Sequence, residues 1–313
     1  MHRNPRGLTY YPDDRPGIKR ERRGKGFSYI APDGTRIDRG AERDRLIALA
    51  VPPAYEQVWI CPLENGHLQA TGRDARQRKQ YRYHPDWASF RDKLKFDGLA
   101  DFGMSLPAIR RKISQGLQAD IGSEELAIAS VLALMDRYSL RVGNAQYAEE
   151  NETFGATTLR ADHLRKAVLK YRAKGGHLVE KQLDRRLARI LGKVSDLPGA
   201  ELCVWVDDAG QTHSVSSEKI NDVIGSYGDD FTAKTFRTWN GSVAALEAAN
   251  QDATLTSISE AAAAALHNTP TIARKSYIHP KVIDLVKAKT APPEGEPKSG
   301  LRKAETQLLT LLS

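Results

Sequence analysis

The chain has 313 residues, of which 40% are hydrophobic and 27% charged, and its formal net charge at pH 7 is +8. This composition supplies enough apolar material for a sizeable core, excludes disorder over most of the chain, and the length suffices for two domains. The first residues are polar and broken by proline, and no run approaches the roughly 18 apolar residues that a membrane span requires. We therefore expect a cytoplasmic protein.

The positive charge is concentrated in the first third of the chain. Residues 1–99 hold 20 Lys and Arg against 13 Asp and Glu, a net of +7, whereas residues 100–313 hold 27 against 26. Clustered Lys and Arg bind a nucleic-acid backbone by displacing its counterions. The pattern fits a domain that grips a polyanion, and it fits a solvated basic surface about equally well.

Cysteine and histidine spacing shows no metal or redox motif. Only Cys61 and Cys203 occur, far apart and outside any CxxC pair, and the eight histidines include no HExxH spacing. We expect two reduced thiols, no metal ion and no cofactor.

The first part of the chain has the pattern of a small antiparallel sheet. The Asp33-Gly34 pair lies between alternating apolar residues, which predicts a hairpin within residues 26–40. Residues 58–61 (VWIC) and 67–70 (HLQA) predict a second strand pair, and RQRKQYRYH would place Tyr81 and Tyr83 on one face if extended. We expect a basic β domain over residues 1–95.

From Asp86 onward the apolar spacing changes to three and four residues, which predicts helices. Two hairpins interrupt them, one turning at Lys174-Gly175-Gly176 and one at residues 208–210. We therefore predict an α+β protein with a mainly helical domain over residues 96–290. Residues 291–300 (APPEGEPKSG) predict a linker, and residues 301–312 an amphipathic helix, so that 291–313 form a terminal segment.

One tyrosine, Tyr277, lies in a basic setting behind an alanine-rich helix. A phenol with a reference pKa near 10 is a poor nucleophile unless nearby cations stabilise the developing charge. Attack on a phosphodiester places charge on non-bridging oxygens, which the fork of an Arg side chain matches. Arg141 and Arg237 are candidates for this role, and Lys174, at a hairpin tip, is a candidate acid. By position alone, each of these cations is more typical of a solvated surface charge.

Taken together, the segments resemble the type IB DNA topoisomerases, specifically the small bacterial and poxvirus-like branch, over nearly the whole chain. The first domain is similar through GIKRERRGKGFSYIAPDG, LAVPPAYEQVWICPLENGHLQATGRDARQRKQYRYHPDW and KFDGLADFGMSLPAIR. The second is similar, in the family's order, through LRVGNAQYAEENETFGATTLR, YRAKGGHLVEKQLDRRLARIL, FTAKTFRTWNGSVAA and HNTPTIARKSYIHP.

The resemblance implies a role for each candidate residue. Arg141 and Arg237 would bind the scissile phosphate, Lys174 would protonate the leaving 5′ oxygen, and Tyr277 would take the 3′ phosphate. It also implies a monomer associated with the nucleoid, whose two domains clamp duplex DNA without ATP, a metal or an obligatory protein partner. Further DNA contacts would come from Lys79, Gln80, Tyr81, Tyr83, Tyr147 and Lys234, although Tyr81 and Tyr83 fit ordinary sheet packing about equally well.

One position departs from the family pattern. The family often has a histidine nine positions before the tyrosine, and here that position is Asn268, with His267 just before it. An amide can donate one hydrogen bond to a phosphate oxygen but carries no charge, so the role passes to Asn268. His267 is interpreted as a helix-end residue on the wrong face.

Three alternatives remain at this point. A tyrosine recombinase uses the same chemistry, but it usually has a histidine three positions before the second arginine, where this chain has Lys234. A non-catalytic DNA-binding module would explain the basic first third but not four catalytic segments. A metal nuclease would need a carboxylate cluster, and adjacent acidic pairs such as Asp207-Asp208 point in different directions.

Overall fold

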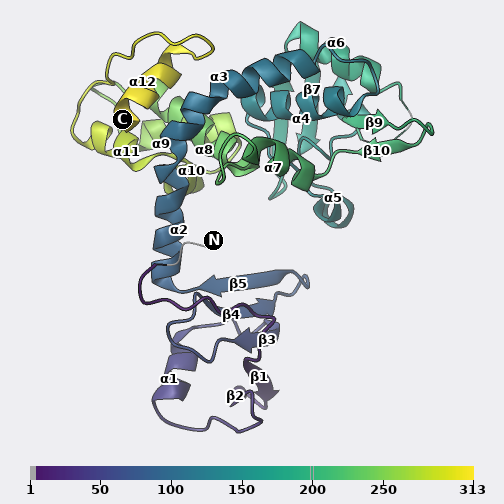
Figure 1. Ribbon diagram of the computed structural model, residues 1–313. Coiled ribbons are helices and arrows are strands. Elements are labelled where there is room, and N and C mark those ends of the chain that lie inside the picture. Colours follow the sequence, from purple (N-terminus) through teal and green to yellow (C-terminus); the bar gives the residue numbers. More distant parts are fainter. Residues whose placement is uncertain (1–4, 198, 200) are drawn as a thin grey trace. The chain divides into compact units, whose positions relative to one another are not determined.

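The computed structural model describes residues 5–197, 199 and 201–313, without the side chains of Lys93 and Tyr147. The chain divides into two compact units, Met1–Leu94 and Lys95–Ser313, and the helix α2 (Pro85–Asp97) contains the boundary between them (Figure 1). The first unit is a sheet and the second is mainly helical with small hairpins, so the α+β prediction is confirmed.

The first unit is built on a five-stranded antiparallel sheet with the order β2-β1-β3-β4-β5. Its strands are β1 (Ile18–Arg23), β2 (Gly26–Ile30), β3 (Glu56–Ile60), β4 (Leu68–Arg73) and β5 (Lys79–Tyr83), and α1 (Ala41–Ala48) is its helix. The sheet and α1 share a small hydrophobic core made of Ile18, Tyr29, Leu46, Val58, Ile60 and Ala70.

The predicted hairpin over residues 26–40 is only partly correct. The Asp33-Gly34 turn forms, because the Asp33 carboxylate accepts a hydrogen bond from the Thr35 amide at 2.8 Å and Gly34 has a φ of +87°. However, its second arm is a single bridge between Ile30 and Arg36 rather than a strand. The long partner of β2 is β1, and the two strands are joined by a tight turn in which Gly24 has a φ of +55°.

The second unit surrounds its hairpins with helices. The helices are α3 (Leu99–Gly116), α4 (Glu124–Tyr138), α5 (Ala145–Asn151), α6 (Arg185–Val194), α7 (Ser217–Gly225), α8 (Ala233–Glu247), α9 (Leu255–Leu266), α10 (Pro270–Tyr277), α11 (Pro280–Lys287) and α12 (Lys303–Leu312). A short helical turn (Ala161–His163) leads into the sheet β6 (Leu164–Arg165), β7 (Val168–Arg172) and β8 (Leu178–Gln182), and β9 (Val204–Val206) pairs with β10 (Thr212–Ser214). Both predicted hairpins, β7–β8 and β9–β10, are confirmed.

Close packing at the centre of this unit depends on a glycine. Phe102 of α3 packs edge-on against Phe236 and Trp239 of α8, and all three side chains are fully buried. A β-carbon at Gly103 would lie 2.3 Å from the Trp239 ring and 2.8 Å from Leu309 of α12. Gly103 therefore lets α3, α8 and α12 meet around one indole.

The terminal helix packs on its own chain. α12 contacts α3, α8 and α11, and Figure 1 shows it beside α3. The predicted linker 291–300 packs closely against this helix, since a β-carbon at Gly295 would lie 2.6 Å from the backbone of Thr306. Cys61 and Cys203 are free and buried.

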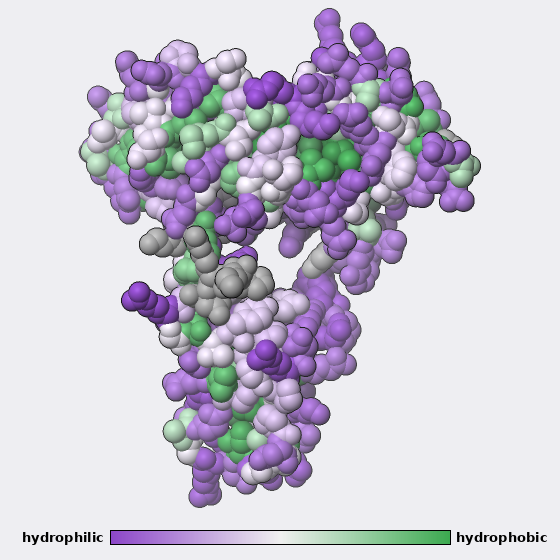
Figure 2. All heavy atoms as spheres, in the orientation of Figure 1, coloured by the Kyte–Doolittle hydropathy of each residue, from purple (hydrophilic) through white to green (hydrophobic). Residues whose placement is uncertain are grey.

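On the face seen in Figure 2 the surface is mainly hydrophilic, and hydrophobic residues form only small patches. In the described part of the chain, no helix combines the length and the apolar character needed to cross a membrane.

His279 joins α10 to α11. Its Nδ1 accepts a hydrogen bond from the Lys281 amide at 3.1 Å, which caps α11, and its ring packs edge-on against Phe96. Burial, and then the charge of Lys281, lower the pKa of His279 from 6.5 to about 4, against an opposing effect of Asp97. The folded chain therefore holds this imidazole in its neutral form.

We expect opposite effects from two helical Gly→Ala changes. Gly103→Ala should lower the free energy of unfolding by about 1–3 kcal/mol, because its methyl overlaps Trp239. The matched control Gly192→Ala, in α6, has open space around its β-carbon and should raise that free energy by about 0.5–1 kcal/mol. Urea denaturation measures both, and equal effects of the same sign would contradict the packing described.

We also expect His279 to contribute to acid sensitivity. Because its folded pKa lies below its unfolded value, the stability that it gives is complete above about pH 6.5 and is lost as the pH falls toward about 4. His279→Asn keeps a capping oxygen but cannot titrate, so its melting temperature should fall less between pH 7 and pH 4.5 than that of the wild type. Parallel melting curves for the two proteins over that range would rule the contribution out.

Candidate active site

A pocket of about 610 Å³ in the second unit brings together the five residues for which the sequence predicts a catalytic role. They come from separate segments of the chain and share this pocket with Lys234, which the sequence predicts to contact DNA. Its lining consists of Arg141, Val142, Lys174, Gly175, His177, Ala233, Lys234, Arg237, Asn268, Ile272 and Tyr277. Four of these side chains are cationic and none of those described is acidic, so the pocket is suited to an anion.

The backbone around Arg141 is fixed by two close approaches. α4 ends at Ser139 in a left-handed conformation, with φ +58°, and the chain then turns toward the pocket. The carbonyl oxygen of Arg141 accepts a hydrogen bond from the Ala156 amide at 2.8 Å. A β-carbon at Gly155 would lie 2.7 Å from that same oxygen, so only glycine allows this pairing.

Arg237, near the start of α8, is 4% exposed. Its guanidinium donates hydrogen bonds to the carbonyl oxygens of Ser139 and, at 2.8 Å, of Leu266, while its Nε has no partner among the described residues. Burial, and then the charge of Arg141, lower the pKa of Arg237 to about 10. Two like charges are thus held together in a site where no carboxylate from the described part of the chain compensates them.

Asn268 lies against the other arginine. Its Oδ1 accepts a hydrogen bond from Arg141 Nη2 at 2.5 Å, and this orients the amide so that Nδ2 is the free end. Nδ2 is buried and has no partner among the described residues. A buried donor without an acceptor is costly, and an anion in the pocket would supply the missing acceptor.

His267 caps the C-terminal end of α9, as the sequence predicts, but its ring is not remote from the pocket cations. Burial, and then the charges of Lys181, Arg237 and Arg141, lower the pKa of His267 to about 4. The imidazole is therefore neutral near pH 7.

Lys174 lies at the tip of the β7–β8 hairpin. Gly175 and Gly176 follow it with φ values of +86° and +79°, and the Gly176 amide donates to the Ala173 carbonyl at 2.9 Å. These glycines make the tight turn that presents the exposed lysine to the pocket.

Tyr277 is the last residue of α10 and is anchored to α8. Its carbonyl oxygen accepts a hydrogen bond from Ser242 Oγ at 3.1 Å. A β-carbon at Gly241 would lie 3.0 Å from the Tyr277 backbone, so this glycine admits α10 close to α8. The Arg237 guanidinium lies 5.2 Å from the centre of the Tyr277 ring, within cation–π distance.

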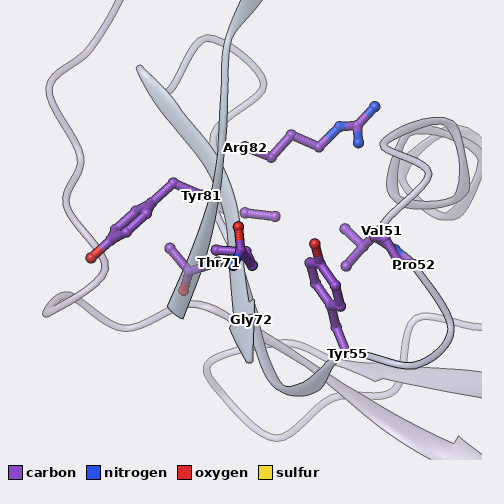
Figure 3. A pocket seen from close by; sticks show the side chains of 9 residues that line it. Val51, Pro52, Tyr55, Thr71, Gly72, Tyr81 and Arg82 are labelled. Carbon is purple, nitrogen blue, oxygen red and sulfur yellow. The ribbon is translucent and has the colours of Figure 1, made fainter. Parts of the chain in front are cut away.

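In the first unit, β5 exposes the residues predicted to contact DNA. Tyr81 and Tyr83 are 52% and 46% exposed and stack on each other, which differs from ordinary sheet packing. Lys79 pairs with Asp13 at 2.6 Å, and Gln80 donates to Asp74 at 3.0 Å, so both are held by acidic neighbours. Figure 3 shows the Tyr81 ring pointing away from a small pocket beside Tyr55.

The side chain of Tyr147 lies outside the described residues, although its backbone belongs to α5. Sequence reasoning missed Tyr171 and Lys181, which lie near enough to Arg237 for its charge to act on their pKa. Burial raises the pKa of Tyr171, so its phenol is neutral, whereas burial and then Arg237 lower the pKa of Lys181. Tyr171 is buried and Lys181 is half-buried. Val179 of β8 and Leu183, just after it, are buried, and this alternation could have placed Lys181 on the inner face. Within the described ranges, no three His, Cys, Asp or Glu residues are placed to share a metal ion.

Comparison with known proteins identifies the family of the chain. Residues 26–74 match the family described as bacterial DNA topoisomerase IB, N-terminal domain, and residues 79–289 match the eukaryotic DNA topoisomerase I catalytic core. The second match contains all five pocket residues named above.

Two curated relatives are similar to the chain. DNA topoisomerase 1B of Acanthamoeba polyphaga mimivirus is 28% identical over 245 residues, which cover 74% of this chain and 72% of that protein. DNA topoisomerase 1 of Mycosarcoma maydis is 25% identical over 175 residues, which cover 49% of this chain and 17% of that protein. The chain therefore belongs to the type IB DNA topoisomerases, isomerases that change the topology of DNA.

Proposed function

We propose that Tyr277 is the nucleophile with which this chain cleaves one strand of duplex DNA. A type IB topoisomerase relaxes supercoiled DNA through a 3′-phosphotyrosyl intermediate, rotation of the cleaved strand and religation. The observation that carries the assignment is the pocket itself, in which one tyrosine, four cationic side chains and an amide converge without an acidic residue among those described.

In this mechanism Arg141 and Arg237 stabilise the phosphorane-like transition state. Charge develops on the non-bridging oxygens as the phenolic oxygen attacks, and guanidinium groups held in place by Asn268 and by backbone carbonyls need little reorganisation to meet it. Asn268 Nδ2 donates a further hydrogen bond to one of these oxygens.

Lys174 acts as the general acid. As the bond to the 5′ oxygen breaks, its ammonium donates a proton to that oxygen, and in religation the neutral amine takes the proton back. The phosphotyrosyl bond conserves the energy of the broken phosphodiester, so resealing consumes no ATP.

The first unit contributes binding by its charge. Its net excess of basic residues, with the exposed Tyr81 and Tyr83, fits contacts to phosphates and to a groove of duplex DNA. All five catalytic groups come from one chain, so the site needs no second copy, and we propose that a monomer acts on DNA without an obligatory protein partner.

A tyrosine recombinase is the second candidate, because it would use the same groups. Lys234 lines the pocket three positions before Arg237, where recombinases usually have histidine, and the first unit matches a topoisomerase domain. Both observations favour relaxation over strand exchange.

Tyr277→Phe should abolish relaxation. The change removes one hydroxyl and little packing, so DNA binding should persist while the covalent complex disappears. The measurement is relaxation of a supercoiled plasmid in EDTA without ATP, followed by trapping of the covalent complex with detergent. Tyr227→Phe, at a tyrosine that does not line the pocket, is the matched control and should relax the plasmid at the wild-type rate.

Relaxation by Tyr277→Phe would exclude Tyr277 as the nucleophile. If the wild type instead joined two DNA duplexes without relaxing either, the recombinase would be the correct reading.

Lys174→Ala should slow the cleavage of ordinary DNA by about 10²–10⁴-fold. A duplex with a sulfur at the 5′ leaving position needs no proton donor, so this substrate should restore most of the rate. Single-turnover cleavage of both substrates, built on a site mapped in the plasmid, measures the difference. Lys170→Ala, on the same hairpin and paired with Glu180, is the control, and equal slowing of both substrates by Lys174→Ala would remove the acid role.

A further inference from the structure

A buried ionic network connects the C-terminal helix α12 to α3 and α4, and it contacts α8, which carries Arg237. It contains Glu305 of α12, Arg110 of α3 and Asp136 of α4, with Arg302 at the start of α12. Asp136 is 6% exposed and Glu305 is fully buried. In Figure 1, α12 and α3 lie together at the end of the unit that also holds α11.

Arg110 uses all five of its N–H donors in this network. It donates to both oxygens of Asp136, at 2.9 Å each, and to both oxygens of Glu305, at 2.8 and 2.9 Å. Its fifth donor binds the carbonyl oxygen of Gly300 at 2.8 Å, just before α12. Two bidentate pairs of this kind fix distance and angle together, which a flexible or apolar contact does not.

Glu305 also accepts a hydrogen bond from α8. The Trp239 indole N–H donates to its Oε1 at 3.3 Å, and Arg302 donates through its side chain at 2.9 Å and its backbone amide at 2.8 Å. Burial alone would raise the pKa of Glu305, but the bonds from Arg110 and Arg302 outweigh it and lower the pKa to about 2. The carboxylate is therefore ionised throughout the neutral range.

Hydrogen bonds and short stretches of chain link Trp239 and Asp136 to the two pocket arginines. Asn240, next to Trp239, donates to the Asp136 carbonyl and to Ser139 Oγ, at 3.0 Å each. Arg237, less than one turn earlier on α8, donates to the Ser139 carbonyl. Arg141 follows Ser139 by two residues. The network thus holds the end of α4 and the start of α8, the two places from which the arginines enter the pocket.

We propose that Glu305 is a positioning residue for DNA cleavage and religation, through Arg110 and Trp239, which set the separation of Arg141 and Arg237. The proposal rests on the roles assigned to these arginines under the proposed function. It assigns to the C-terminal helix a part in catalysis, although no residue of α12 lines the pocket.

The composition of the network supports a geometric role. A buried ion pair is weak evidence for stability, because apolar residues of the same volume often stabilise a core as well. The rest of the contact between α12 and the core of the second unit is hydrophobic and includes Leu308 and Leu309. The ionic network takes the place of apolar side chains at one point of this contact. Directional bonds at that point fix helix placement, and the transition state is sensitive to displacements of about 1 Å.

Glu305→Gln tests the proposal, because an amide nitrogen facing Arg110 breaks one bidentate pair while the volume is kept. The substrate is a suicide duplex built on a cleavage site mapped in the wild type. Cleavage and religation rate constants should each fall by about tenfold or more. The dissociation constant for DNA and the covalent fraction at equilibrium should stay within about threefold, because the arginines serve one transition state in both directions and binding depends on many phosphate contacts.

Leu308→Ala is the matched control, since it removes fully buried packing from the same helix without touching the ionic network. It should lower the melting temperature and the reactive fraction but leave both rate constants unchanged. Wild-type rate constants for Glu305→Gln, or equal losses in both variants, would overturn the proposal. If Glu305→Gln does not fold, Trp239→Phe is the second test, because it removes the indole N–H and keeps an aromatic ring. Wild-type rate constants for Trp239→Phe would also overturn the proposal.

The proposed function is tested separately by Tyr277→Phe on the same duplex. A covalent complex with that variant would refute the nucleophile, whatever Glu305 does. A complex that depends on Tyr277 and forms at the wild-type rate in Glu305→Gln would refute the positioning role alone.

Discussion

The site depends on one buried charge, the guanidinium of Arg237. Two of its donors bind carbonyl oxygens at helix ends, Leu266 at the end of α9 and Ser139 just after α4. Helix C-termini carry partial negative charge, which offsets part of the cost of burying a cation. The rest of the charge has no carboxylate partner among the described residues, so the free protein holds a cation whose best partner is a phosphate. Because Arg237 lies on α8, these two hydrogen bonds also hold α8 against the ends of α4 and α9.

Backbone contact, more than side-chain contact, sets the positions of the other groups. Gly241 brings the Tyr277 backbone against α8, and Gly155 brings a loop against the Arg141 carbonyl. In each case the two segments lie so close that a β-carbon would overlap the neighbouring segment. Moving the segments apart would break the hydrogen bonds beside them. The nucleophile and the first arginine are therefore held by parts of the fold that tolerate little motion.

The sequence could predict local structure and chemistry better than long-range pairing. Period-two and turn signals identified the β7–β8 and β9–β10 hairpins, and the family resemblance named the pocket residues. It could not identify β1 as the long partner of β2, because the Asp33-Gly34 signal was stronger than the one at Gly24. Nor could it find Glu305, since contacts with Arg110 and Trp239, far away in the chain, exist only after the helices have packed.

The electrostatics of the pocket also explain why an amide can stand where the family often has an imidazole. His267 shows what a histidine experiences here, because burial and the charges of Lys181, Arg237 and Arg141 lower its pKa to about 4. An imidazole at position 268 would lie near the same arginines, whose positive charges disfavour its protonated form. Asn268 can donate a hydrogen bond without carrying a charge, and its Oδ1 in addition accepts from Arg141. An amide at this position therefore places no further positive charge beside the two arginines, and it anchors the first of them.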